Sequence, residues 1–254
     1  MLTGVVVGLG CLGTFSALVS AMTGVGGGVV LLSGLLLVVP ATAAIPLHGA
    51  VQFSAGLSRL VAFRGAVIWP IVWLFLFGML PGAILGAMSL GWLQKVNPSF
   101  VLILIACFIL QTVFLQPPST ASAGTQDVHR GGLFGLGFLC GLLGMFVGST
   151  GPIVSGWLLR HGIVKDAHIG SKSVMQGSAH FVKIPLFMWG LDFDFRPYLA
   201  PLVLMVCGVI IGTVLGKKLL TKLSSGGFNL IVKGLLTVIA LRLLYTEVPT
   251  LFTS

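Results

Sequence analysis

Charged residues are scarce in this chain. Its 254 residues include 14 Lys and Arg and five Asp and Glu, so that 7% are charged, whereas 56% are hydrophobic. A soluble domain carries about a quarter charged residues. The composition therefore excludes an ordinary soluble protein and predicts a surface covered mostly by lipid. A membrane-spanning helix needs about 20 mostly apolar residues, so the length allows up to about ten spans and leaves no room for a separate soluble domain.

Several kinds of functional motif are also missing. The four cysteines lie in apolar stretches without paired spacing, which predicts packing residues and no disulfide or metal site. The chain has no HExxH motif, no paired intramembrane aspartates and no Gly-x-Ser-Gly motif. The net charge of +9 comes from basic residues scattered among hydrophobic runs, which is typical of cytoplasmic loops in membrane proteins. We therefore expect no enzyme, no metal, no cofactor and no nucleic-acid partner.

The two halves of the chain align with each other. At an offset of 124 residues the matched pairs include glycines, glutamines, serines and cations: Gly24 and Gly148, Gly27 and Gly151, Gln52 and Gln176, Ser54 and Ser178, Arg59 and Lys183. After an insertion near residues 192–197 the offset becomes 130, and Gly78, Gly82 and Gly86 fall on Gly208, Gly212 and Gly216. Glycine matches alone mean little in a chain with 36 glycines, but matched polar residues inside apolar segments indicate a duplication. We predict a first transmembrane repeat over residues 1–115, a linker over 116–130 and a second repeat over 131–254.

Each half contains five hydrophobic segments. They run roughly over 3–22, 28–39, 44–63, 66–90 and 99–115 in the first half, and over 131–147, 152–160, 170–190, 198–216 and 228–245 in the second. Because five is odd, the second half enters the membrane from the opposite side. The sequence therefore predicts an all-α integral membrane protein with two inverted-topology repeats of about five hydrophobic segments each. Inverted repeats are a recurring plan of secondary transporters, which bind substrate near the midplane.

Loop charges independently predict the inversion. The third segment of the first half ends with Arg59 and Arg64, whereas its counterpart is followed by Asp192 and Asp194. The loop after the second segment is uncharged in the first half and basic in the second. Positive residues favour the cytoplasmic side, so equivalent loops lie on opposite sides. The linker is then cytoplasmic and both termini are outside, with Lys95 and Arg196 as exceptions on the outer side.

The second segment of each half is too short to span a bilayer. Both follow a glycine-rich stretch, at residues 23–28 and 147–152. Half-helices with irregular backbone are tolerated at membrane depth where they line a cavity or are buried in protein. Such segments at corresponding positions point to a transporter binding site. Whether they are re-entrant or fully span is left open.

The two glycine-rich turns are candidate anion sites. A turn that opens a helix aims several backbone N–H groups and the positive end of the helix dipole at one point. The alternative is that small residues let helices pack closely, as is common in membranes. The residues proposed to contact an anion are Gly24, Gly26, Gly27, Gly28, Gly148, Ser149, Thr150 and Gly151.

The third segments supply candidate side chains at helical spacing. They are His48, Gln52, Ser54 and Arg59 in the first half, and Lys172, Gln176, Ser178, His180 and Lys183 in the second. Lys183 is the strongest candidate for anion contact because its neighbours are apolar, although a helix-end lysine can also extend to the interface.

Other members of this set have simpler explanations beside the functional one. Lys172 fits better as a positive-inside residue, and Arg59 is evenly balanced because Arg64 is near. The glutamines either contact substrate or bond between helices, and the serines favour packing. His48 and His180 carry protons if transport is proton-coupled, but a single membrane histidine is more often structural.

The chain resembles the TauE/SafE sulfite-exporter family over nearly its whole length. The resemblance rests on the glycine run at 24–28, on the polar third segment with Gln52 and Ser54, and on the ladder of Gly78, Gly82 and Gly86. It implies a multi-pass protein of the cell (plasma or inner) membrane that exports a small sulfur-containing anion such as sulfite, thiosulfate or an organosulfonate like sulfoacetate. The second glycine motif departs from a glycine run, with Ser-Thr-Gly-Pro at 149–152, which bears on selectivity.

Two other functions remain open at this point. One is a transporter or channel for another small anion, and the other is a non-transporting membrane scaffold. Missing intramembrane carboxylates favour an anion over a cation, and a scaffold has no reason to place Arg59 and Lys183 at equivalent positions. We expect alternating access at a midplane site. The expected partners are a small anionic substrate and the lipid bilayer, and a homo-oligomer is left open.

Overall fold

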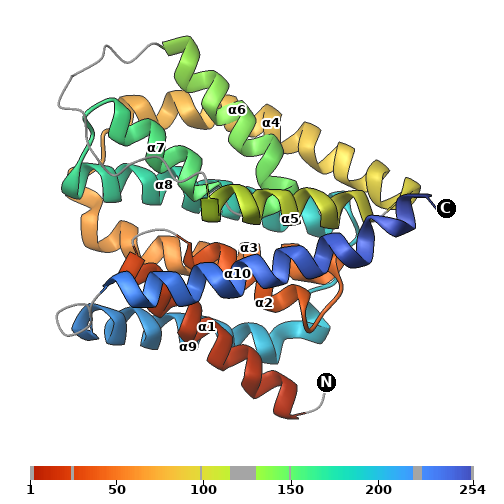
Figure 1. The fold of residues 1–254 in the computed structure, drawn as a ribbon. Coiled ribbons are helices and arrows are strands. Elements are labelled where there is room, and N and C mark those ends of the chain that lie inside the picture. The colour runs from red at the N-terminus through yellow and green to blue at the C-terminus, as the bar shows by residue number, and fades with distance from the viewer. Residues whose placement is uncertain are drawn as a thin grey trace.

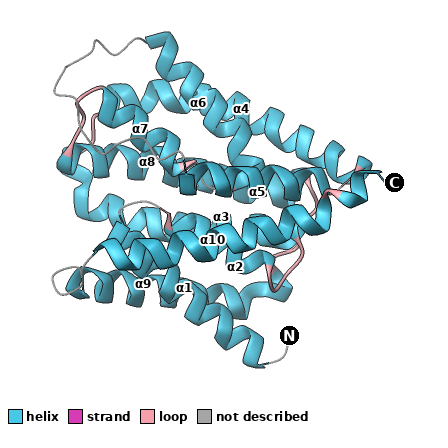
Figure 2. Ribbon diagram, in the orientation of Figure 1, coloured by secondary structure: helices cyan, strands magenta, loops and turns pink. Residues whose placement is uncertain are grey.

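The computed structural model describes residues 3–23, 26–97, 99–114, 130–148, 150–219 and 225–252. Over these ranges the regular elements are ten α-helices and four short helical turns, without a strand (Figure 2). The expected all-α fold is confirmed. Gly24, Ser149 and nearly all of the expected linker lie outside the described residues.

The helices match the ten hydrophobic segments closely. In the first half they are α1 Thr3–Thr23, α2 Gly27–Leu36, α3 Ala41–Phe63, α4 Trp69–Val96 and α5 Ser99–Phe114. In the second half they are α6 Arg130–Val147, α7 Gly151–Arg160, α8 Lys165–Pro185, α9 Leu199–Leu219 and α10 Ser225–Glu247. The largest differences are at the end of α4, which extends to Val96 and not to residue 90, and at the start of α8, which begins at Lys165 and not at residue 170. The α8 difference has a simple cause. The first turn of α8 is polar, and hydropathy marks only the apolar part of a helix.

Several helices are long and apolar enough to cross a membrane. In the described part of the chain these are Trp69–Val96, Arg130–Val147, Arg196–Leu215 and Lys233–Phe252. Their outer faces carry exposed apolar side chains, such as Phe77 on α4 and Ile211 on α9. The chain is therefore a multi-pass membrane protein. By contrast, α2 and α7 have ten residues each, which is about 15 Å of helix, or about half of the hydrocarbon core.

Two helix pairs pack at backbone contact through glycines. On α4, a Cβ at Gly78 or Gly82 would collide with the backbone oxygens of Phe134 and Phe138 on α6. Between α9 and α1 the same collisions recur, where Gly208 and Gly212 face the backbone oxygens of Gly10 and Thr14. The glycines of the two interfaces differ by 130 and their partners by 124, which are the two offsets of the sequence alignment. The two interfaces are therefore equivalent residue by residue.

Helices α3 and α8 lie between these pairs. In Figure 1, α4 and α6 occupy one face of the bundle and α1 and α9 the opposite face. A Cβ at Gly49 would lie 3.7 Å from the Lys183 side chain, and one at Gly56 would lie 3.2 Å from Cα of Gly177. Because the residue number rises on α3 as it falls on α8, the two central helices run antiparallel.

The chain ends share one end of the bundle. Figure 1 marks N and C at its right, whereas α6 begins and α9 ends at the left. A common side for the two termini was expected. Which side of the membrane this is stays a prediction.

Candidate functional site

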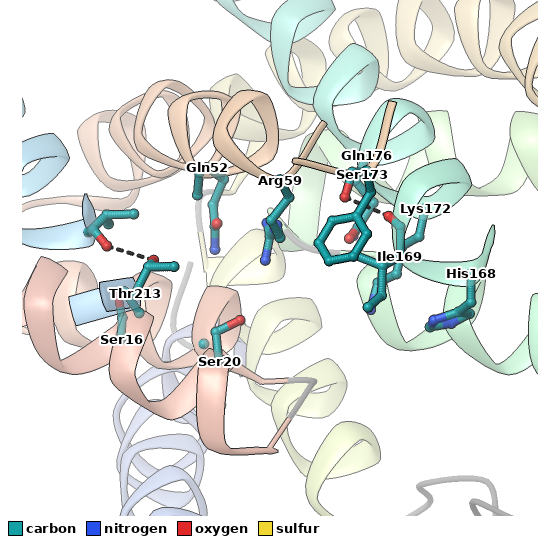
Figure 3. Close-up of a pocket in the computed structure, with 15 residues that line it drawn as sticks. Ser16, Ser20, Gln52, Arg59, His168, Ile169, Lys172, Ser173, Gln176 and Thr213 are labelled. Atoms are coloured by element: carbon teal, nitrogen blue, oxygen red, sulfur yellow. Dashed lines mark hydrogen bonds between the residues drawn. The ribbon is translucent and has the colours of Figure 1, made fainter. Parts of the chain in front are cut away.

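A cavity of about 340 Å³ lies between the two central helices, with α1 and α9 closing one side. Its polar lining comes from four helices, as Figure 3 shows: Ser16 and Ser20 from α1, Gln52 and Arg59 from α3, His168, Lys172, Ser173 and Gln176 from α8, and Thr213 from α9. The apolar part of the lining includes Ala17, Ala55, Phe63 and Val209. The cavity therefore has polar groups on an apolar frame, as ligand sites usually do.

Helical spacing brings the polar side chains of α3 and α8 to one place. Gln52 and Arg59 are seven residues apart, or about two turns, and Ala55 between them also lines the cavity. On α8, Lys172 and Gln176 are one turn apart and face the same space. Figure 3 shows these four side chains approaching the cavity from two sides. The two helices thus present equivalent glutamines, one from each half.

Both glycine-rich turns reach this site. A smaller space of about 40 Å³ is lined by Gly26, Gly28 and Gly151, and it shares Gln52, Arg59, Lys172 and Gln176 with the larger cavity. Gly26 immediately precedes α2 with φ 108°, a left-handed conformation that favours glycine. Gly151 starts α7, with Pro152 in the first turn, where no backbone N–H is needed. The N-termini of two half-helices therefore border one small polar space.

The cavity is basic. Arg59 and Lys172 are part-buried in its wall, and Nζ of Lys172 donates to Oγ of Ser155 at 3.1 Å. No described carboxylate lines either space. In the described part of the chain, the ion pair of Arg196 with Asp194 lies at the surface, with N–O 4.0 Å. Two part-buried cations in a lining without a carboxylate favour an anion as the occupant, since a charge that is partly removed from water and unpaired is costly.

The structure separates the predicted site residues into two groups. Those that line the two spaces are Gly26, Gly27, Gly28, Gln52, Arg59, Gly151, Lys172, Gln176 and His180. Gly24 and Ser149 lie outside the described residues. The others lie elsewhere: His48, Ser54, Gly148, Thr150, Ser178 and Lys183 are absent from the described lining of both spaces.

The strongest sequence candidate, Lys183, is in this second group. Its side chain is 3% exposed, and Nζ donates to the backbone oxygen of Gly148 at 2.8 Å. His48 is fully buried beside it, with its ring 5.6 Å from that of His180. Ser54 donates to the Ala50 oxygen one turn back on its own helix. Lys183 was expected to contact an anion or to extend to the interface; its buried side chain lines neither of the two spaces, and its contact with an anion stays a prediction.

Sequence reasoning missed the contribution of α1 and α9. Ser16 and Ser20 are one turn apart in α1, and Thr213 is the polar residue that α9 presents to the cavity. The signal that could have found the serines is their spacing, because polar residues at i and i+4 share a helix face. Thr213 is next to the Gly212 contact, so only the three-dimensional packing brings it to the site.

A family model for the sulfite exporter TauE/SafE matches residues 9–243. The chain belongs to this family. No curated protein and no solved structure matches it. The family assignment confirms the resemblance inferred from the glycine motifs, and makes the chain one of a family of membrane transporters of sulfur anions. It also agrees with the expectation that the chain is not an enzyme.

Proposed function

We propose that this protein exports a small sulfur oxyanion or organosulfonate, such as sulfite, thiosulfate or sulfoacetate, through the cavity between α3 and α8. The observation that carries the proposal is the pair of cations, Arg59 and Lys172, in a cavity whose described lining has no carboxylate. Membership of the family supports a sulfur anion in general, and the residues of the cavity support an oxyanion in particular.

The side chains of the cavity suit the oxygens of a sulfite or sulfonate group. Arg59 offers a planar fork of donors that fits two oxygens of one anion. Gln52 and Gln176 each carry an amide with two N–H donors. The first N–H groups of α2 and α7 have no partner within their helices, and the dipole there favours negative charge. A hydrogen bond to a charged group contributes about 1.5–3 kcal/mol, so a few of these donors suffice for weak, reversible binding.

The size of the cavity suits a small hydrated anion. Its volume is about 340 Å³, and a water molecule takes about 30 Å³ in the liquid. The space is thus equivalent to about ten waters. A sulfite or sulfonate group with part of its hydration shell fits, which lets the anion bind without losing all of its water.

The packing of the bundle supports two inverted repeats. The α1–α9 and α4–α6 glycine contacts are related by the two sequence offsets, as a two-fold axis would relate them. This axis would run between α3 and α8, which pair with each other antiparallel. A two-fold axis that relates two antiparallel helices is perpendicular to both, and for helices that run across the membrane it lies in the membrane plane, which is the relation between inverted halves.

The position of the cavity supports alternating access. Its lining extends from Gln52 near the middle of α3 to Phe63 at the last residue of that helix, and to His168 in the first turn of α8. These ends carry Arg64 and Lys165, so the positive-inside rule assigns them to the cytoplasm. We infer an inward-open state, from which rocking of the halves would release the anion outside.

Flux measurements in proteoliposomes test this function. Uptake of sulfite and of sulfoacetate would be compared for the unchanged protein, Arg59→Gln and Arg64→Gln. Arg64 is the matched control, since it is exposed and does not line the cavity. We expect Arg59→Gln to lower flux at low substrate concentration by about tenfold or more, and Arg64→Gln to change it little. Equal flux in both variants would refute the site, and transport of carboxylates with no sulfur anion would refute the substrate class.

A further inference from the structure

The repeat supplies a second set of residues equivalent to the cavity lining. Adding 124 to the residue numbers of first-half lining residues, or subtracting 124 from those of second-half lining residues, gives the equivalent positions in the other half. The corresponding pairs that matter here are Ser16 with Cys140, Arg59 with Lys183, and Lys172 with His48. Phe63, at the end of the cavity, corresponds to another phenylalanine, Phe187.

This second set is closed. His48 and Cys140 are fully buried, and Phe187 and Lys183 are 2% and 3% exposed, whereas their counterparts Arg59, Lys172 and Phe63 are part-exposed. Two further equivalent positions lie next to Lys183. A Cβ at Gly49 would lie 3.7 Å from Cδ of Lys183, and one at Gly144 would lie 3.6 Å from Nζ. Gly49 and Gly144 are the counterparts of Ser173 and Ser20, which line the open cavity.

The closed cluster has polar atoms that nothing in the described structure satisfies. Both ring nitrogens of His48 and Nδ1 of His180 are buried without a hydrogen-bond partner among the described residues. Lys183 donates to the oxygen of Gly148, which is neutral. None of the described Asp and Glu residues is buried. Unpaired polar groups and a buried cation cost free energy. An oxyanion would accept from the Lys183 ammonium and from one N–H of each neutral imidazole.

We propose that His48 and Lys183 form a second anion site, which meets the first at His180, a residue that also borders the smaller space, and which opens to the opposite face of the membrane when the Arg59–Lys172 cavity closes. The inference rests on the proposed function and adds the outward-facing half of the pathway. In this second state Lys183 exchanges the Gly148 oxygen for the anion. The glycine contacts hold α1 to α9 and α4 to α6, so the two pairs would move as units about the α3–α8 contact.

A native cysteine makes the inference testable. In a variant with Cys11, Cys107 and Cys207 replaced by alanine, Cys140 is the remaining thiol. Intact cells would be treated with an impermeant sulfonate-bearing thiosulfonate reagent. We expect slow modification of Cys140 from outside. If the open state is populated at about 1%, the rate is about a hundredfold below that of a fully accessible thiol.

A control variant places the thiol in the open cavity. Ser20→Cys combined with Cys140→Ser does so at a part-exposed residue that borders both spaces, so inverted membrane vesicles should show rapid modification from the cytoplasmic side. No modification of Cys140 from outside, over about a thousandfold longer than Ser20→Cys requires from inside, would overturn the second site. Transport of sulfoacetate by the same cells reports on the proposed function separately, since the sulfur-anion proposal can fail while Cys140 still reacts.

A second measurement tests anion binding at the new site. Sulfoacetate is the probe, because sulfite and thiosulfate would themselves react with the reagent. The measured quantity is the external sulfoacetate concentration that halves the rate of Cys140 modification. We expect Lys183→Gln to raise it about tenfold and Arg59→Gln to change it by less than about twofold. Equal shifts in the two variants, or no protection by sulfoacetate in the unchanged protein, would overturn the assignment of Lys183.

Discussion

Glycines on α6 allow a sharp test of the packing that holds the bundle together. A Cβ at Gly137 would collide with the backbone oxygen of Phe75 on α4, whereas one at Gly135, two residues earlier, would meet nothing within 4 Å. Alanine is favoured over glycine inside a helix by about 1 kcal/mol. Gly135→Ala should therefore be neutral or stabilising. Gly137→Ala gains the same propensity, but α4 and α6 have to move apart.

The cost of this separation can be estimated. Overpacking of a filled core costs about 1–3 kcal/mol, and here the group that would have to yield is backbone, which has no rotamer to change. The net effect of Gly137→Ala is then a loss of up to about 2 kcal/mol. For a domain of this size that corresponds to a fall in Tm of about 4–8 °C.

The assay is thermal unfolding of the two purified variants in the same detergent. Gly13→Ala is a third arm, because Gly13 is the repeat counterpart of Gly137 and its Cβ would lie 2.6 Å from the backbone oxygen of Met205. We expect the Tm values of Gly13→Ala and Gly137→Ala to lie below that of Gly135→Ala by similar amounts. A Tm for Gly137→Ala at or above that of Gly135→Ala would refute the reasoning.

Three further predictions concern the site. Gly26→Ala and Gly162→Ala both force alanine into positive φ, at 108° and 73°, so both should lose about 1–2 kcal/mol of stability. Only Gly26 borders the site, so only Gly26→Ala should also raise the half-saturation concentration in the flux assay, and a rise in both would contradict this. Ser155→Ala removes the acceptor of Lys172 and should raise the sulfoacetate concentration that gives half-maximal flux about threefold. Substitution of an exposed serine should leave this concentration unchanged. A single cysteine at Ser119 should be labelled only from the cytoplasm, and labelling from outside would reverse the topology.

The helices of this fold were readable from the sequence because the bilayer imposes strong hydropathy. The half-helices were readable too, since ten residues cannot span the hydrocarbon and each follows glycines. The start of α8 could not be predicted from the sequence. Its first turn carries Lys165 and Asp166, where a helix N-terminus favours the acidic residue but hydropathy gives no signal.

The cavity was predictable only in part, for a geometric reason. Helical spacing groups Gln52 with Arg59 and Lys172 with Gln176, because residues one or two turns apart share a face. It cannot bring α1 or α9 to that face, since the contact depends on how closely Gly208 and Gly212 let two backbones approach. Ser16 and Thr213 therefore come to the site through packing, and the spacing of residues within one helix does not show which helix packs against which.

Lys183 shows why a repeat sequence cannot identify the residue that contacts substrate in one state. Its apolar neighbours made it the strongest candidate for anion contact, but it is buried, whereas its counterpart Arg59 lines the cavity. In a transporter with alternating access, only one of two equivalent half-pathways is open at a time. Both sets of residues are equally visible in the sequence. Under the proposed alternating access, the conformation of the protein determines whether Arg59 or Lys183 is exposed to substrate. In the proposed cycle, Arg59 contacts the anion in the inward-open state and Lys183 contacts it in the outward-open state, so the two assignments are compatible.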